Sequence, residues 1–367
     1  MADYVAAAAR VDGVVNPADP LQVAEGLAEE LLFPTAMATD AGDRVPRGHL
    51  DRIADAGLYG LFGPVEAGGL GARETVGRAV MEIMAGGCLT TTFVWMPHHG
   101  AVRSVAGSTT PGLREQWLAP MCRGEQRAGF ALGGILPGGP GVTASAVDGG
   151  WLLNGVAPWM TGWGLVDVIH TAAHGPDGII LWSLIDAVES PTLTVDRARL
   201  LAVHASVTVS VQFHDHFVPA DRVTGTEPLS GWVRTAPSPD RLAPVGQDGK
   251  WSLGRHHMAT VTGSLALGLT ARCCRLMGPG PLDEELETHR AALELAATSA
   301  PDTLPTVRAH ASQLAVRAAA SLVVATGSRS ILLEEHPQRL IREATFLLVF
   351  GTRPPIPAEL LKLFAER

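Results

Sequence analysis

Two pairs of adjacent histidines are the residues of this sequence best suited to moving a proton. His98 and His99 stand in a predicted helix, and His256 and His257 stand near the start of a later one. Histidine titrates closest to neutral pH, so either pair could act as a general acid or base. A histidine on an apolar helix is more often a hydrogen-bonded core residue, and this alternative stays open for both pairs.

A third histidine-rich stretch could suggest a metal ion. His214, Asp215 and His216 include two histidines on alternate positions of a predicted strand. A structural metal site needs further ligands, and no third ligand stands nearby in the sequence. We therefore predict no metal site.

The small number of lysines and the spacing of the cysteines argue against several other kinds of chemistry. Lys250 and Lys362 are the only lysines, and the one Gly-Lys pair is followed by Trp251 instead of Ser or Thr. A P-loop needs that hydroxyl residue, so NTPase chemistry is disfavoured, as is a pyridoxal-phosphate Schiff base. The four cysteines lack Cys-x-x-Cys and zinc-finger spacing, which indicates a reduced, cytoplasmic protein.

Length and composition indicate a globular protein that is not exported. The chain has 367 residues, 46% hydrophobic and 18% charged, with a net charge of −9. This length predicts two or three compact units, and the acidic balance argues against binding nucleic acid or an anionic membrane. Since no apolar run reaches the ~20 residues that cross a bilayer and residues 1–10 lack a signal pattern, we expect no membrane span.

The side chains named above stand on three segments. The first and third segments have a helical hydrophobic period, and the middle segment has the alternating period of a strand. Apolar residues recur at three-to-four spacing over residues 20–126 and again after residue 251, which predicts helices. Between them, Val207, Val209 and Val211 alternate with Thr208, which predicts a half-buried antiparallel strand. The predicted fold is α+β, with an N-terminal helical domain (1–128), a central antiparallel β-barrel or sandwich (129–224), a linker (225–250) and a C-terminal four-helix bundle (251–367).

Four motifs occur in a fixed order along this α, β, α arrangement. They are residues 57–62 with the glycine turn 68–71, residues 151–155 followed by Pro158-Trp159-Met160-Thr161, the segment 213–223, and residues 338–343 followed by Gly351-Thr352. In this order they resemble the acyl-CoA dehydrogenase superfamily, and the resemblance covers nearly the whole chain. One such motif would be weak, whereas four in the right order are fairly specific.

The resemblance implies FAD between the β domain and the bundle. Trp159 would pack against the flavin ring, and Thr161 would form a hydrogen bond near its reactive nitrogen. Gly327 and Thr352 would approach the adenosine half, partly across a subunit interface, and the resemblance implies a homodimer or homotetramer. The predicted cofactor contacts are Phe130, Leu132, Gly133, Trp159, Met160, Thr161, Gly327, Gly351 and Thr352.

The sequence departs from the family at the catalytic base. Phe350 replaces the family's glutamate before Gly-Thr, and Gly254 occupies the alternative glutamate position on the first bundle helix. That glutamate removes the α-proton while hydride passes to the flavin, so proton transfer would fall to another residue. His256, close to Gly254, and His99 are the predicted replacements.

The elements that bind the flavin are also reduced. Where the family has Thr-Glu-Pro-Gly at the end of a strand, this chain continues Leu132-Gly133-Gly134-Ile135, so a hydroxyl and a carboxylate are lost. Arg275 stands nearest to the family's pyrophosphate-binding arginine. FAD binding remains the prediction.

Three functions are compatible with these residues. The first is a flavin-dependent oxidoreductase of the acyl-CoA dehydrogenase type, acting on an acyl group carried by CoA or an acyl carrier protein. The second is a flavin monooxygenase or N-hydroxylase on the same fold, which needs no glutamate for the α-proton. The third is a flavin-free or non-catalytic descendant, acting as a partner subunit or using the acyl groove for other chemistry.

Overall fold

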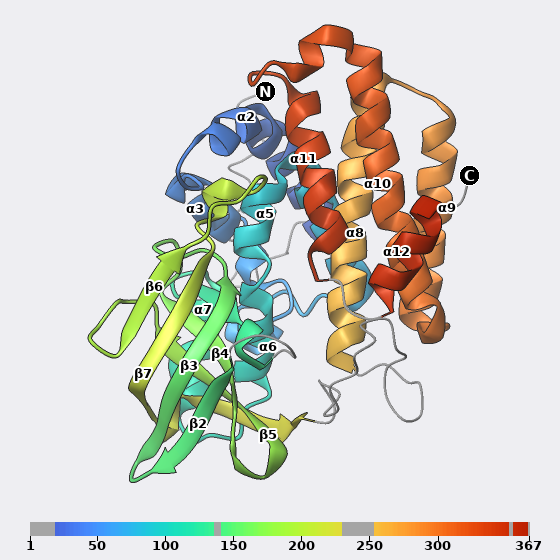
Figure 1. Cartoon of the computed structure of the whole chain (residues 1–367). Helices are drawn as coiled ribbons and strands as arrows, with labels where there is room; N and C mark the ends of the chain where they lie inside the picture. The colour runs from blue at the N-terminus through green and yellow to red at the C-terminus, as the bar shows by residue number, and fades with distance from the viewer. Residues whose placement is uncertain (1–18, 136–140, 230–252, 352–354, 366–367) are drawn as a thin grey trace, which may run out of the picture.

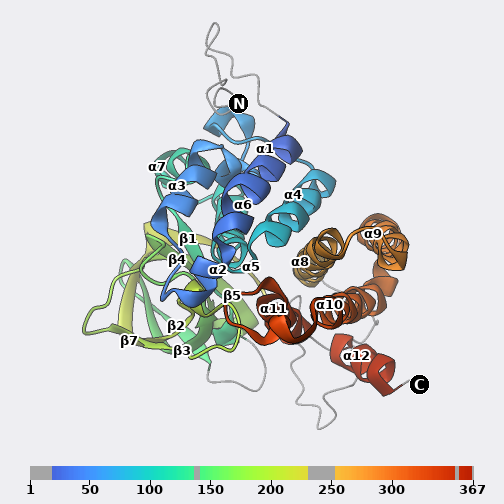
Figure 2. The same ribbon diagram turned by 90° about the horizontal axis from the view of Figure 1, so that it is seen from above.

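The molecule has three parts in chain order: helices, a β domain and a second set of helices. The computed structural model describes residues 19–135, 141–229, 253–351 and 355–365, with the side chains of residues 253–258 left out. Figures 1 and 2 show the β domain and the C-terminal helices on opposite sides of the N-terminal helices. The predicted fold class is confirmed.

The N-terminal part is helical, as the apolar spacing predicts. One π-helical turn interrupts the first long helical run, and Pro97 separates Trp95 from His98, so the histidine pair begins a helix of its own. The elements are α1 (Pro20–Leu27), η1 (Ala28–Leu32), α2 (Phe33–Ala41), α3 (Arg47–Asp55), η2 (Leu58–Gly60), η3 (Val65–Ala67), α4 (Glu74–Gly87), α5 (Leu89–Trp95), α6 (His98–Ala106) and α7 (Leu113–Cys122).

The central part is one mostly antiparallel sheet of eight strands, in the order β6-β7-β3-β2-β4-β5-β8 with β1 paired to β4. The pairing of β1 with β4 is parallel. The strands are β1 (Ala128–Ala131), β2 (Val142–Val147), β3 (Gly150–Met160), β4 (Val168–His174), β5 (Ile179–Asp186), β6 (Leu193–Arg197), β7 (Val209–Pro219) and β8 (Val223–Pro228).

Strand β7 confirms the predicted alternation and corrects its start. Val209, Val211 and Phe213 are buried and alternate with less buried residues. Val207 and Thr208 precede the strand, and Thr208 is buried instead of lying on a solvent-facing side. The hydroxyl of Thr208 therefore needs a partner inside the protein.

The C-terminal part contains the four predicted long helices and one more. The elements are α8 (Leu253–Met277), α9 (Pro281–Thr298), α10 (Leu304–Thr326), η10 (Gly327–Ile331), α11 (His336–Val349) and α12 (Ile356–Ala365). The sequence pattern did not predict α12. Strand β8 includes residues 224–228, which the sequence placed in or beside the linker, and residues 230–252 lie outside the described part of the chain.

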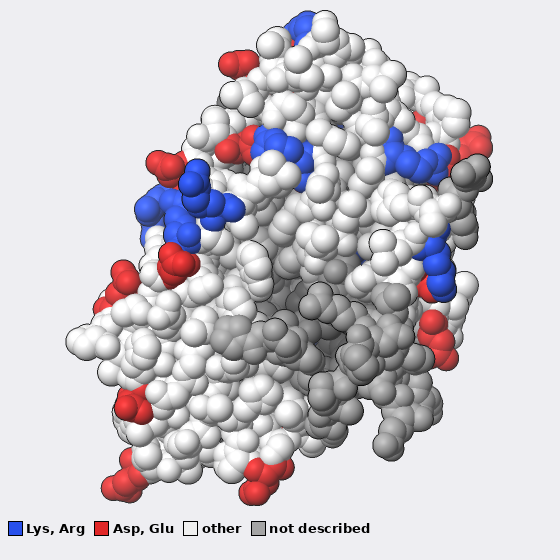
Figure 3. Space-filling model, viewed as in Figure 1, with Lys and Arg blue, Asp and Glu red and all other residues white. Residues whose placement is uncertain are grey.

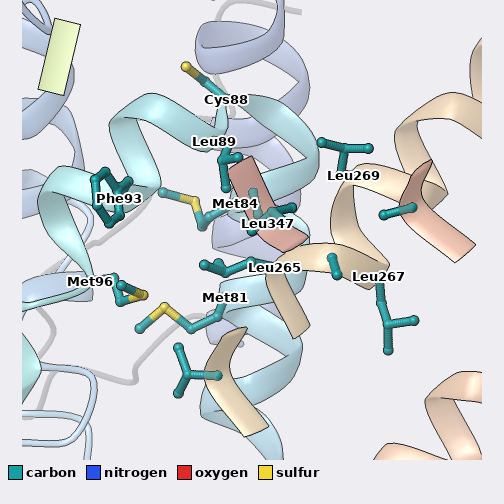
Figure 4. Packing of buried hydrophobic residues seen from close by; sticks show 14 of the residues in the cluster. Met81, Met84, Cys88, Leu89, Phe93, Met96, Leu265, Leu267, Leu269 and Leu347 are labelled. Carbon is teal, nitrogen blue, oxygen red and sulfur yellow. The ribbon is translucent and has the colours of Figure 1, made fainter. Parts of the chain in front are cut away.

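One continuous apolar core joins the N-terminal helices to the bundle. Figure 4 shows Met84, Leu265 and Leu347, from α4, α8 and α11, close together in this core. A Cβ atom on Gly268 of α8 would lie 2.1 Å from the backbone oxygen of Glu82 in α4. Only glycine allows these two helices to approach backbone to backbone.

Acidic and basic side chains are distributed in small groups on the face drawn in Figure 3. Where described atoms are visible there, no broad band of one sign crosses the surface. Among the helices that the structure describes, none is both long and apolar enough to cross a bilayer.

Candidate functional site

The end of strand β3 has an unusual backbone. Between Ala157 and Met160, two residues of β3 oppose one residue of β7, which is a β-bulge. Within it Trp159 has a φ of +66° and is 64% exposed, whereas Met160 and Thr161 are buried. A bulky residue with positive φ is strained, and such strain concentrates at functional positions. The bulge turns a large aromatic ring outward beside a buried hydroxyl.

Strand β1 and the turn that follows it pack directly against this end of β3. A Cβ atom on Gly133 would lie 2.2 Å from the oxygen of Pro158, and one on Gly129 would lie 2.5 Å from Cε of Met160. Backbone packing therefore requires glycine at position 133, and Gly129 leaves room for the side chain of Met160. The predicted cofactor contacts on β1 and β3 come together here, although Gly133 offers no side chain to a ligand.

The aromatic ring of Phe130 lies in a second aromatic group on the β domain. Its ring stacks on Trp182 with centroids 5.6 Å apart, and His170 stacks on the same tryptophan at 4.9 Å. Leu132 belongs to the small apolar cluster around Trp182. Burial lowers the pKa of His170 to about 3, so its ring is neutral at physiological pH.

Three buried hydroxyl groups meet behind the turn. The Oγ1 atoms of Thr161 and Thr208 are 3.3 Å apart, and the Oγ of Ser206 is 2.8 Å from the Oγ1 of Thr208. All three side chains are at least 97% buried. Neither Ser206 nor Thr208 can be recognised from the sequence as a site residue, because their significance depends on the contact of Thr208 with Thr161 across the sheet. The Ser-x-Thr spacing beside a strand was the only local signal.

The bundle contributes an aromatic group at the end of α11. Phe350 packs edge-on against Phe93 of α5, with centroids 4.8 Å apart, and stacks on Phe346 at 5.1 Å. Phe93 also contacts Phe346 at 5.1 Å. The position that the resemblance assigns to a glutamate is thus part of a cluster of three phenylalanine rings.

A fully buried arginine lies beneath this turn. Arg308 of α10 donates to the Oγ1 of Thr262 at 2.7 Å and to the backbone oxygens of Leu347 at 2.9 Å and Phe350 at 3.3 Å. It also hydrogen-bonds Ser312. Burial lowers the pKa of Arg308 to about 9, so the guanidinium stays charged near neutral pH. The carbonyls at the C-terminal end of α11 carry partial negative charge and stabilise this cation.

Part of the chain is similar in sequence to a known protein family. Residues 21–125 match the family model described as "Acyl-CoA dehydrogenase, N-terminal domain". The human mitochondrial short-chain specific acyl-CoA dehydrogenase is 26% identical over an alignment of 229 residues that covers 58% of this chain and 53% of that protein. These matches support membership of the acyl-CoA dehydrogenase superfamily. Its match spans about half the length of such curated relatives.

Two solved structures share the fold along nearly the whole chain. A glutaryl-CoA dehydrogenase from Mycobacterium smegmatis in complex with FADH2 has a TM-score of 0.73 at 16% identity, covering 95% of this chain and 94% of that one. The dibenzothiophene monooxygenase from Paenibacillus sp. A11-2 also has a TM-score of 0.73 at 16% identity, covering 94% and 96%. These likenesses establish the fold alone.

The other predicted cofactor contacts and the predicted base positions belong to the C-terminal helical part of the chain. Gly351 follows Phe350 with a φ of +64°, and Gly327 has a φ of +72° at the start of η10. The turn formed by η10 joins α10 to α11 at the top of Figure 1, away from the β domain at the lower left. Thr352 and the side chains at positions 254 and 256 lie outside the described residues.

The histidine pair of α6 lies inside the helical domain. His99 is buried, with its ring edge-on to Trp95 at 4.7 Å and to Phe62 at 5.3 Å. His98 accepts the backbone N–H of Ala128 at Nδ1, so its Nε2–H donates to the oxygen of Met121. Burial lowers the pKa of His98 to about 3. His98 therefore holds α7 and β1 together as a neutral ring.

The remaining candidate residues have structural partners. Within the described part of the chain, no three His, Cys, Asp or Glu side chains gather closely enough to hold a metal ion. His216 instead lies 2.9 Å from the hydroxyl of Thr192. Arg275, considered for the pyrophosphate, forms an ion pair with Glu29 at 2.7 Å.

Proposed function

We propose that this protein is a flavin-dependent oxidoreductase of the acyl-CoA dehydrogenase type that acts on an acyl thioester of CoA or an acyl carrier protein. The observation that carries the proposal is the β3 bulge, which holds Trp159 outward in a strained conformation beside the buried Thr161. Exposing a tryptophan at the cost of backbone strain is explained if a planar group covers its ring. Membership of the superfamily supports the same assignment.

The residues at this turn fit a flavin on one side of the proposed site. Trp159 would stack on the ring system, and Thr161 would offer its hydroxyl to the edge of the ring. When bound, FAD would supply the acceptor for a hydride from the substrate. A glutaryl-CoA dehydrogenase of the same fold is described in complex with FADH2, which supports FAD as the cofactor.

Proton transfer is the part of the proposal that departs from the superfamily. With Phe350 in an aromatic cluster, we propose His256 on α8 as the group that removes the substrate proton. His99 is the second candidate, and its enclosure by Trp95 and Phe62 favours a structural role.

A flavin monooxygenase is the alternative function. The apolar cluster of Phe93, Phe346 and Phe350 suits a reaction that needs no carboxylate at this position. The dibenzothiophene monooxygenase shares the fold, which supports keeping this alternative. A flavin-free descendant is the third possibility, and it predicts a protein that takes up no flavin.

The first experiment incubates the purified protein with FAD, removes free flavin by gel filtration and records an absorbance spectrum. Retained flavin bands support both redox functions, and a colourless protein contradicts them. An anaerobic titration with a series of acyl-CoA thioesters then separates the two. Bleaching of the flavin with formation of the α,β-unsaturated product supports dehydrogenation, whereas a requirement for oxygen and a flavin reductase supports monooxygenation.

The proposed flavin contact is tested by Trp159→Ala. Since Trp159 is 64% exposed, we expect the melting temperature to change little, while loss of stacking weakens FAD binding by about tenfold or more. Phe217→Ala is the matched control, because Phe217 is an exposed aromatic that faces Leu152 near the other end of β3. Equal FAD affinity in the two variants would contradict the proposed contact.

The subunit arrangement is also a proposal. Gly327 would approach the adenosine half of FAD from a second copy of the chain, since η10 lies far from the β domain in Figure 1. A homodimer or homotetramer is therefore proposed, and its mass in solution can be measured by light scattering.

A further inference from the structure

The segment before β7 contains two strained valines. Val203 has a φ of +52° and Val207 a φ of +48°, and both side chains are buried. A β-branched residue in the left-handed region is a strained conformational outlier. Two such residues within five positions require strong restraint from their surroundings.

Hydrogen bonds from both helical parts restrain this segment. The backbone N–H of Val45 donates to the oxygen of Ala205 at 2.8 Å. Arg342 of α11 donates to the oxygen of Leu201 at 3.0 Å and forms an ion pair with Asp40 of α2. The segment is thus fixed from the N-terminal helices and from the bundle.

The segment in turn holds the backbone that follows the β3 bulge. The N–H of Gly162 donates to the oxygen of Ser206 at 2.9 Å, and the N–H of Trp163 donates to the oxygen of Val207 at 3.2 Å. The hydroxyl of Thr208 then contacts the hydroxyls of Thr161 and Ser206. Backbone and side-chain bonds therefore converge on the turn that contains Thr161.

The three hydroxyls form a chain that can run in either direction. Each carries one proton, and the two bonds within the chain use two of the three protons. When the chain runs from Ser206 to Thr161, the hydroxyl of Thr161 is free to donate. When it runs the other way, Thr161 donates to Thr208 and is free to accept.

We propose that Ser206 and Thr208 are positioning residues that let Thr161 change between donating and accepting a hydrogen bond as a bound flavin changes redox state. A flavin ring nitrogen accepts a hydrogen bond when oxidised and donates one after taking up hydride, and bonds to the ring nitrogens tune the cofactor. The inference rests on the proposed function, and it assigns residues that the superfamily motifs of this sequence do not include.

The direction of the effect follows from the buried protons. In Thr208→Val, Thr161 can still donate to the oxidised flavin. When it must accept, its own proton has no partner at position 208, and an unsatisfied buried donor is costly. The reduced flavin is therefore destabilised more than the oxidised one, and the reduction potential becomes more negative.

The test measures the two-electron reduction potential of the FAD-loaded full chain. We expect Thr208→Val to weaken binding of reduced FAD about tenfold more than binding of oxidised FAD, which corresponds to about 30 mV for a two-electron couple. Thr208→Ser keeps the hydroxyl and should restore the wild-type potential. Thr171→Val is the matched control, because Thr171 is a buried threonine on β4 whose hydroxyl donates to Ile169.

The outcomes separate this inference from the proposed function. A wild-type protein that takes up no FAD contradicts the proposed function and the inference together. A flavin-loaded wild type with an unchanged potential in Thr208→Val, or a Thr208→Ser variant shifted as far as Thr208→Val, overturns the inference alone. If Thr208→Val does not fold, Ser206→Ala should shift the potential in the same direction by a smaller amount, and no shift would overturn the inference.

Discussion

The two sides of the proposed site are built from different chemistry. On the β domain, Thr161 lies in a chain of buried hydroxyls beside the exposed ring of Trp159. On the bundle, Phe350 lies in an aromatic cluster above the buried charge of Arg308. Hydroxyls can exchange protons and reverse their hydrogen bonds, whereas phenylalanine rings cannot.

Under the proposed function, this difference means that the two halves of the site follow the superfamily pattern to different extents. The Trp-x-Thr motif is present where the flavin is proposed to bind, and Phe350 stands where the resemblance leads us to expect a carboxylate. The turn itself is nevertheless held firmly, because Arg308 binds the oxygens of Leu347 and Phe350. The bundle side therefore has a defined geometry around an apolar residue.

The largest expected effect comes from removing the buried charge. Arg308→Met removes the donor to Thr262 and to the oxygen of Phe350, while the oxygen of Leu347 keeps a hydrogen bond from Ser312. We expect the variant to lower the free energy of unfolding by about 3 kcal/mol. Urea denaturation measures this loss. Arg317→Met on the same helix is the control, because Arg317 is 49% exposed in its ion pair with Glu285 and should cost less than about 1 kcal/mol. Equal stability of the two variants would show that Arg308 does not hold the turn.

The next prediction restores a carboxylate to the bundle side. In the FAD-loaded protein, Phe350→Glu should speed anaerobic flavin bleaching by a matching acyl-CoA thioester about a hundredfold, which is typical of a positioned general base. Stopped-flow absorbance measures the rate. Phe346→Glu is the control, because Phe346 stacks on Phe350 one turn earlier in α11. A rate in Phe350→Glu no higher than in wild type or in Phe346→Glu contradicts the assigned position.

The smallest expected effect is on the pH dependence of the unfolding free energy, and it comes from His170 of the β domain. Burial lowers the pKa of His170 from 6.5 to about 3, so below pH 6.5 the unfolded chain binds a proton that the folded protein does not. Stability therefore falls as the pH drops from 6.5 towards 3, by about 1.4 kcal/mol at pH 5.5 for this one group. His170→Gln, which can still reach Thr224, should reduce the difference in unfolding free energy between pH 7.5 and 5.5 by that amount. His214→Gln serves as the control because that ring is exposed, and an equal pH dependence in wild type and His170→Gln would rule out the burial effect.

Much of the fold follows from local pattern. Helical spacing predicted the four long helices α8 to α11, and alternation predicted the buried face of β7. The pattern missed α12 and placed Thr208 on a solvent-facing side, although it is buried. Alternation identifies which residues share a face, but a residue just outside a strand no longer follows that rule.

The proposed site likewise combines residues that the sequence predicted with residues that only the structure identified. Trp159 and Thr161 were predicted because they stand two positions apart in one motif. The roles of Thr208 and Arg308 could not be predicted, because Thr208 meets Thr161, 47 residues away, and Arg308 meets Thr262 and Leu347, 46 and 39 residues away. Ser206 takes part only through its bond to Thr208 and its backbone bond to Gly162. A hydroxyl or guanidinium in a sequence carries no indication of which distant group will satisfy it.

Residue order alone therefore decided the three-part architecture and the family, because hydrophobic period and short motifs are properties of neighbouring residues. Folding decided which polar groups meet in the interior. Burial makes an unsatisfied hydrogen-bonding group costly, so the packing of β3 against the segment before β7, and of α10 against α11, selects the partners of Thr161 and Arg308. The outward ring of Trp159 also depends on tertiary structure, since the bulge exists only where β3 pairs with β7.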